Sequence, residues 1–115
     1  MASTDHAGAP GAGLDPVIHP LPRLRICALL DPVTEEEFGA LRDLLGVSDS
    51  ALSKQLAALS DAEYTGQRRA IRGGRSRVWV RLTPRGRRAF RAHVAALTEL
   101  AAIHPSGSAQ RTNKE

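Results

Sequence analysis

Arginine side chains are concentrated in one short stretch of the sequence, where their chemistry would be the binding of phosphate and other anions. Residues 68–91, RRAIRGGRSRVWVRLTPRGRRAFR, contain ten arginines, no lysine and no acidic residue. Arginine stays charged and presents a planar fork of N–H donors that matches phosphate oxygens. Because like charges repel, such a run is disordered or faces a polyanion. Apolar residues recur between the arginines, so we expect a folded, polyanion-binding surface.

Charge is divided unevenly along the 115 residues, which carry a net charge of +4. Residues 1–63 contain ten acidic and four basic groups, whereas residues 64–98 contain ten arginines and no acid. The second half is therefore predicted to be the anion-binding half. The single cysteine excludes an intramolecular disulfide and is typical of a reducing cytoplasm, where we expect the protein. No signal peptide or membrane-spanning run is evident, so no membrane contact is expected.

The arginines fall on a predicted hairpin and on the helix that follows it. QRRAIR and SRVWVRL alternate as strands do, and Gly73-Gly74 between them suits a tight turn, which predicts a hairpin over 67–82. Thr83 and Pro84 are typical of a helix cap and a first helical position. We expect a long helix from Pro84 to about residue 104.

Three shorter helices are predicted before the hairpin. The first is expected over 19–31, and the second is expected to be capped by Thr34, with three glutamates in its first turn. Gly46 ends the second helix in a left-handed conformation, and Ser48 caps a third helix over 48–62. A helix, a glycine-containing tight turn and another helix form the pattern of a helix-turn-helix.

Together these segments resemble a known family. RLRICALL, LRDLLGVSDSALSKQLAAL and RGGRSRVWVRLTPRGRRAF, read in this order, are similar to the compact winged helix-turn-helix regulators of the MarR/ArsR-like superfamily. The resemblance extends from residue 16 to about residue 103. It implies a mainly α fold with a small β-hairpin and a long C-terminal dimerisation helix. It also implies a homodimer that binds double-stranded DNA to regulate transcription.

In such proteins a recognition helix, here 48–62, enters the major groove, and a wing, here 67–82, contacts the backbone or the minor groove. We expect a DNA-binding domain over 16–104 between flexible tails at 1–15 and 105–115. The chain departs from the family at Glu63, where members typically have a left-handed glycine. Either the recognition helix continues for one more residue or the site accepts strain.

Helical spacing divides the recognition helix into two faces. Three leucines, Leu52, Leu56 and Leu59, define the buried face, and small polar residues lie on the opposite face. The polar residues of the recognition helix and the arginines around the hairpin turn are the predicted DNA-binding residues: Ser48, Ser50, Ser53, Lys54, Gln55, Arg72, Arg75 and Arg77. Trp79 shares a strand face with arginines, and we expect it to pack against a neighbouring helix rather than to stack on a base.

The last helix carries two apolar rows, and one row is enough for the core of a single subunit. The second row predicts a helix–helix interface with another copy of the chain. The expected interface residues are Leu21, Phe90, His93, Leu97, Leu100 and Ile103.

Other functions are less well supported by the residues. No nucleophile–base spacing, phosphate loop or carboxylate pair indicates an enzyme, and we expect no metal or cofactor. The few aromatic residues argue against single-stranded RNA as a ligand. The main alternative is an interaction module that docks an acidic partner protein through its arginines. The sequence does not reveal whether a small-molecule effector exists.

Overall fold

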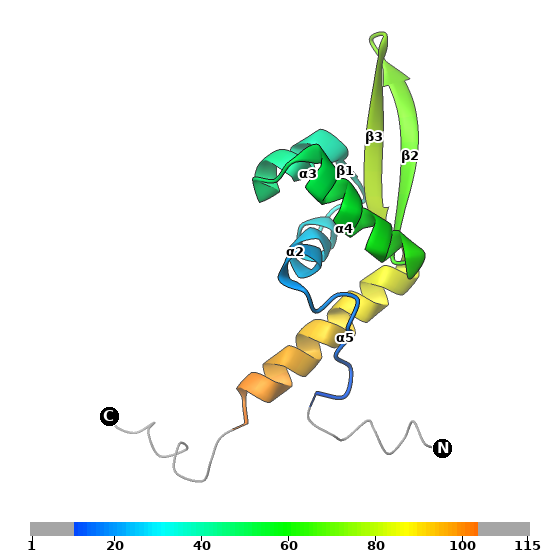
Figure 1. The fold of residues 1–115 in the computed structure, drawn as a ribbon. Coiled ribbons are helices and arrows are strands. Elements are labelled where there is room, and N and C mark those ends of the chain that lie inside the picture. Colours follow the sequence, from blue (N-terminus) through cyan, green and yellow to red (C-terminus); the bar gives the residue numbers. More distant parts are fainter. Residues whose placement is uncertain (1–10, 104–115) are drawn as a thin grey trace, which may run out of the picture.

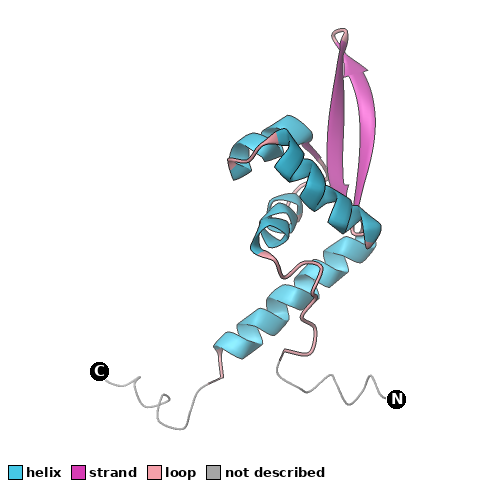
Figure 2. Cartoon of the chain, in the orientation of Figure 1, coloured by secondary structure: helices cyan, strands magenta, loops and turns pink. Residues whose placement is uncertain are grey.

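The computed structural model describes residues 11–103, and these form a winged helix (Figures 1 and 2). Its elements are α2 (Leu21–Leu30), β1 (Glu36–Glu37), α3 (Phe38–Leu45), α4 (Asp49–Asp61), β2 (Thr65–Arg72), β3 (Arg75–Leu82) and α5 (Pro84–Ala101). The predicted fold class is confirmed, with four helices and a small antiparallel sheet. Nowhere in residues 11–103 is a helix both long and apolar enough to cross a membrane. Most of the predicted tails, residues 1–10 and 105–115, lie outside the described residues.

The helix-turn-helix is formed by α3 and α4, and its local signals act as predicted. Gly46 has φ 68°, and its N–H bonds the carbonyl oxygen of Arg42 at the end of α3. The side chain of Ser48 accepts a hydrogen bond of 3.1 Å from the N–H of Ala51 and so caps α4. Arg42 also lies 2.9 Å from Asp49 in the first turn of α4, which ties the two helices together across the turn.

The predicted start of α3 is wrong, because two of the three glutamates form a strand. Glu37, not Thr34, is the N-cap of α3, and its side chain makes no capping hydrogen bond. Glu36 pairs with Val80 and Glu37 with Trp79, so β1 becomes the third strand of the sheet. The free edge of β3 offers backbone donors and acceptors that must be paired. That edge is formed by residues more than forty positions away, which a local capping rule does not consider.

The sheet has the strand order β1-β3-β2 and is antiparallel throughout. The wing, predicted over 67–82, extends over residues 65–82 and keeps this definition below. It consists of β2, β3 and the turn at Gly73-Gly74, whose φ angles are 60° and 77°. Two successive positive φ angles are typical of the type I′ hairpin turn, in which glycine is unstrained. Figure 1 shows that the outer part of the wing extends well beyond the helices.

The core lies where α2, α3, α4 and the inner part of the sheet meet α5. Its members are aliphatic side chains, with one cysteine and one phenylalanine: Ile18, Ile26, Cys27, Leu30, Leu41, Leu52, Leu56, Leu59, Val80, Leu82 and Phe90. The three leucines predicted to form the inner face of α4 are each no more than 1% exposed. This packing holds α4 against the body by one face and leaves its other face free.

Asp15, in the segment 11–18, links α5 to Tyr64, which lies between α4 and β2. The N–H of Asp15 donates to Nδ1 of His93 at 2.9 Å, and its carboxylate accepts a hydrogen bond of 2.5 Å from the hydroxyl of Tyr64. Asp15, which was expected to lie in a flexible tail, therefore bonds directly to the folded domain. Figure 1 shows this segment running beside α5.

Candidate nucleic-acid interface

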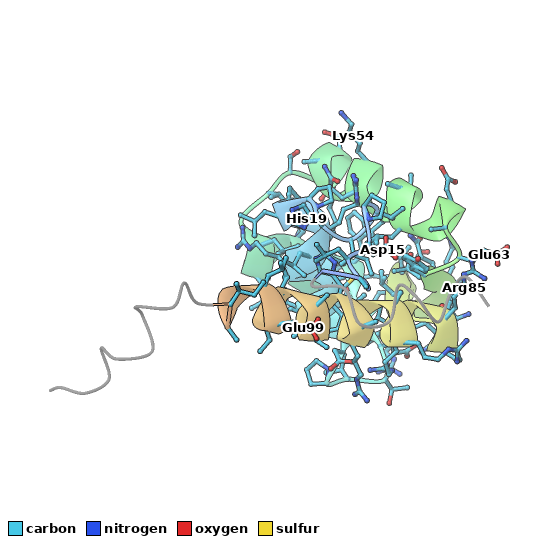
Figure 3. The ribbon with its side chains drawn as sticks, turned by 90° about the horizontal axis from the view of Figure 1, so that it is seen from below. Asp15, His19, Lys54, Glu63, Arg85 and Glu99 are labelled. Carbon is cyan, nitrogen blue, oxygen red and sulfur yellow. The ribbon has the colours of Figure 1, made fainter. Side chains whose placement is uncertain are left out.

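The free face of α4 carries most of the predicted base-contacting residues. Ser50, Ser53 and Lys54 are exposed, and Figure 3 shows Lys54 pointing outward from α4, away from α5. Ser48 is also exposed, although its hydroxyl oxygen already accepts the capping hydrogen bond. Small hydroxyl side chains around a single lysine would let the helix approach base edges closely.

Gln55 differs from its neighbours because its side chain turns toward α2. It is half-buried, and its Oε1 accepts a hydrogen bond of 3.0 Å from Nη1 of Arg23. Arg23 in turn donates from Nε to the carbonyl oxygen of Val17. Gln55 thus links α4 to α2 through its side-chain oxygen. The N–H₂ group of its side chain remains available to donate to another partner.

The predicted arginines of the wing fall into two groups. Arg72 and Arg75 are directly paired in the strand register beside the turn, and both are exposed. Arg77 is half-buried, and its Nη1 lies 2.6 Å from Oε2 of Glu37. Arg77 therefore links β3 to β1. Arg72 and Arg75 lie at the end of the hairpin, where the wing extends beyond the helices.

A second ion pair also attaches the wing. Arg68 contacts the Glu35 carboxylate through Nε at 2.9 Å and Nη2 at 2.5 Å, and this hydrogen bonding holds the pKa of Glu35 below its usual range. The guanidinium of Arg68 also covers the ring of Trp79, 5.5 Å from its centroid. Trp79 is thus occupied within the sheet and is not a free platform for a base.

The acid-free run is therefore only partly neutralised by other parts of the chain. Arg68, Arg77, Arg87 and Arg91 form ion pairs with glutamates or with Asp31. Within residues 11–103 the other six arginines of the run form none: Arg69, Arg72, Arg75, Arg81, Arg85 and Arg88. Three of these six lie in the wing tip, defined here as residues 69–76. The wing tip is therefore the part of the hairpin whose arginines are free to bind an anion of another molecule.

Arg69 is a candidate contact that the sequence analysis missed. It is exposed, and its Nη1 donates to Oγ of Ser76 across the hairpin at 3.1 Å. Its position in the same acid-free run was the signal that could have identified it. Arg69 lies on the opposite face of the hairpin from Arg72 and Arg75, because side chains alternate along a strand.

Glu63 lies between α4 and the wing and adopts the left-handed conformation expected of glycine. Its φ is 65°, so the helix does not continue and the site accepts strain. The N–H of Tyr64 bonds the carbonyl oxygen of Leu59, and the hydroxyl of Thr83 bonds the carbonyl oxygen of Glu63 at 2.7 Å. These bonds hold the left-handed residue in place.

We expect Glu63→Gly to raise the free energy of unfolding by about 0.5–1 kcal/mol, because glycine adopts positive φ without the Cβ clash. The gain stays below the full strain energy because glycine also increases the entropy of the unfolded chain. Urea denaturation followed by circular dichroism measures it. Glu63→Ala is the matched control, since it removes the carboxylate and keeps the strain. An equal gain from alanine would mean that charge, not backbone conformation, is responsible.

The predicted dimer residues do not all lie on the surface. Phe90 and His93 are buried within the chain's own fold, at 8% and 0% exposure. Leu21, Leu100 and Ile103 are exposed, at 63%, 38% and 53%, and Leu97 is half-buried. Burial varies along α5 and between its two apolar rows. Phe90, His93 and Ala96 (5%) are buried, Val94 is 40% exposed, and Leu100 and Ile103, at and after the end of the helix, are exposed.

The histidine and cysteine side chains that could hold a metal have other roles. Nδ1 of His93 accepts a hydrogen bond from the N–H of Asp15. Burial, and to a smaller extent the His19 ring, whose centroid lies 5.4 Å from that of His93, lowers the pKa of His93. Burial, with smaller effects of Asp15 and Asp31, raises the pKa of the Cys27 thiol to about 12. In the part of the chain that the structure describes, no three His, Cys, Asp or Glu residues gather as metal ligands would.

Comparison with known proteins identifies the architecture. The profile of the winged helix DNA-binding domain family matches residues 23–101. A transcriptional regulator homologue from Pyrococcus horikoshii OT3 superposes with a TM-score of 0.71 at 17% identity, over 88% of this chain and 95% of that one. YusO from Bacillus subtilis covers 96% of this chain and 74% of its own, with a TM-score of 0.57 and 15% identity.

A zinc-responsive MarR family member, ZitR of Lactococcus lactis, has the same fold over a smaller region. Its TM-score is 0.52 at 22% identity, over 68% of this chain and 53% of that one. No curated protein sequence matches the chain. These likenesses concern the fold, and the family match covers the three helices, the wing and α5.

Proposed function

Because the chain belongs to the winged helix DNA-binding domain family, we propose that it is a transcriptional regulator that binds specific double-stranded DNA sequences as a homodimer. In this proposal α4 enters the major groove and the wing contacts the backbone or the minor groove. The observation that carries it is the combination of two features in one fold. The free face of α4 is small and polar around Lys54, and the wing tip holds arginines that no acid of residues 11–103 neutralises.

The residues proposed to contact DNA differ in the hydrogen bonds and ion pairs that their side chains already make within the chain. Lys54, Ser50 and Ser53 are the candidates for base contacts, and Arg72 and Arg75 for phosphate contacts. Ser48 and Gln55 remain candidates for contacts through the donors that their internal hydrogen bonds leave free. Arg77 would contribute mainly through its field, because its guanidinium is paired with Glu37.

The proposed dimer uses the part of α5 that extends past the subunit. Leu100 lies seven residues, or two turns, beyond His93 and so on the same face of the helix. His93 is buried, but Leu100 and Ile103 are partly in water. With the half-buried Leu97 they offer a surface that a second copy would cover, and the exposed Leu21 at the start of α2 is a further candidate for the interface. Two recognition helices related by a two-fold axis would read half-sites about 34–36 Å apart.

Selection of bound sequences from random duplex DNA, followed by comparison of wild type with Lys54→Ala, tests the proposal. Wild type should prefer a selected, pseudo-palindromic duplex over a scrambled one. Lys54→Ala should lose about 1–3 kcal/mol of that preference and relax it at one position of each half-site. Fluorescence anisotropy on both duplexes measures the effect.

Arg91→Ala is the charge control, because it removes one positive charge from α5 and leaves α4 untouched. It should weaken binding to both duplexes slightly and keep the preference. If wild type binds the selected and scrambled duplexes equally at physiological salt, sequence-specific regulation is wrong. Binding to an acidic protein without binding to DNA would instead support the interaction-module alternative.

A further inference from the structure

The wing tip carries an apolar side chain in water among its arginines. Ile71 is 77% exposed, more than any other large apolar residue of the part of the chain that the structure describes. It lies two residues before Gly73, so it extends from the hairpin close to its end. A β-branched residue suits a strand, but strand preference alone would be met equally by threonine, which is polar.

The register explains how Ile71 comes to be exposed. Ile71 pairs with Ser76, and on the same face of the hairpin Val78, Val80 and Leu82 follow toward the body. Val80 and Leu82 are buried and Val78 is half-buried. The apolar row therefore continues outward past the end of the core, to a point where the chain's own side chains no longer cover it.

The charges around Ile71 indicate what could cover it. Arg69 is beside it on the same face, and Arg72 and Arg75 are on the opposite face. Among residues 11–103 none of these three arginines has an acidic partner. An apolar protein surface that covered Ile71 would leave these three arginines without partners. The minor groove of a duplex, about 6 Å wide, offers phosphates along its edges and the apolar faces of deoxyriboses along its walls.

We infer that Ile71 makes the apolar contact of the wing inside the minor groove, while Arg69, Arg72 and Arg75 bind the flanking phosphates. This inference rests on the proposed DNA binding, in which the wing contacts the backbone or the minor groove, and goes beyond it by naming an apolar residue that enters the groove. Apolar side chains inserted there respond to groove width and to obstruction of the groove floor. Ile71 would thus favour duplexes that lack the guanine amino group.

The test compares Ile71→Val with Ile71→Thr. These replacements have the same shape and both suit a strand, so they differ in one methyl and one hydroxyl group. Two duplex probes have the same major-groove groups: poly(dG-dC) carries the guanine N2 amino group in the minor groove, and poly(dI-dC) lacks it. Wild type and Ile71→Val should bind poly(dI-dC) more tightly than poly(dG-dC). Ile71→Thr should bind poly(dI-dC) about fivefold more weakly and lose most of that preference.

Salt dependence separates the apolar contact from the ionic ones. Ile71→Thr should leave the slope of log affinity against log salt unchanged, whereas Arg72→Ala should lower it by about one unit. If Ile71→Thr binds both probes as wild type does, the inference is wrong while the DNA-binding proposal stands. If wild type binds neither probe nor any selected duplex, the DNA-binding proposal itself fails.

Discussion

Replacing Gly86 with alanine is expected to lower the free energy of unfolding by about 3 kcal/mol or more. A Cβ atom at Gly86 would lie 2.1 Å from the carbonyl oxygen of Tyr64 and 2.8 Å from its carbonyl carbon. That oxygen accepts a hydrogen bond from Thr83, and the N–H of Tyr64 bonds Leu59 at the end of α4. The peptide cannot move aside without breaking the junction between α4, the wing and α5. We expect the thermal midpoint to fall by about 12 °C or more.

Gly39→Ala is the matched control, because Gly39 is also a helical glycine but has space beside it. An added Cβ there would lie 3.5 Å from Nη2 of Arg42, the end of a flexible side chain. Alanine should stabilise α3 by up to about 1 kcal/mol. Urea denaturation of both variants measures the two effects, which should have opposite signs. Similar small effects at both positions would show that α5 is not held this tightly against Tyr64.

Replacing Leu100 with glutamate is expected to turn the proposed dimer into a folded monomer. The carboxylate would be buried between helices without a partner, which costs several kcal/mol and should weaken association by more than about a hundredfold. Light scattering at micromolar concentration measures the mass, and circular dichroism measures the fold. Loss of the dimer should also abolish the preference for two spaced half-sites, because each subunit would read one of them.

Thr98→Glu is the control for this experiment, since it adds the same charge to an exposed position within the same turn of α5. It should leave the dimer intact. If Leu100→Glu fails to fold, Ile103→Glu replaces it, because Ile103 follows α5 and is 53% exposed. A wild-type protein that is monomeric at micromolar concentration would contradict the dimer proposal directly.

Local features of the fold were predictable from the sequence because they depend on residues close together in the chain. Gly46 ends α3 and Ser48 caps α4, and the turn at Gly73-Gly74 is formed by two residues with positive φ. Thr83 caps α5 through the N–H of Gly86, with a hydrogen bond of 2.9 Å. Each of these contacts spans at most four residues, so composition and spacing are sufficient to indicate them.

The roles of charged residues were not predictable in the same way. Glu35 and Glu37, expected in the first turn of a helix, pair with Arg68 and Arg77, which are 33 and 40 positions away in sequence. Gln55, expected on a DNA-facing flank, bonds Arg23 at a separation of 32 residues. A strand edge or a buried flank exists only after folding, so which charges it neutralises depends on topology.

By itself the sequence determined that the chain forms a winged helix with an acidic first half and an arginine-rich wing and last helix. Periodicity, caps and turn residues indicate the four helices and the hairpin, because these signals act within a few residues. They did not indicate β1, which exists only through its pairing with β3. The tertiary structure decided which arginines stay unpaired, why Gly86 cannot carry a side chain, and where along α5 the core ends. Burial and charge neutralisation are set by distances between elements remote in the chain. For this reason Phe90 and His93 became core residues, while Leu100, on the same helical face as His93, was left partly exposed.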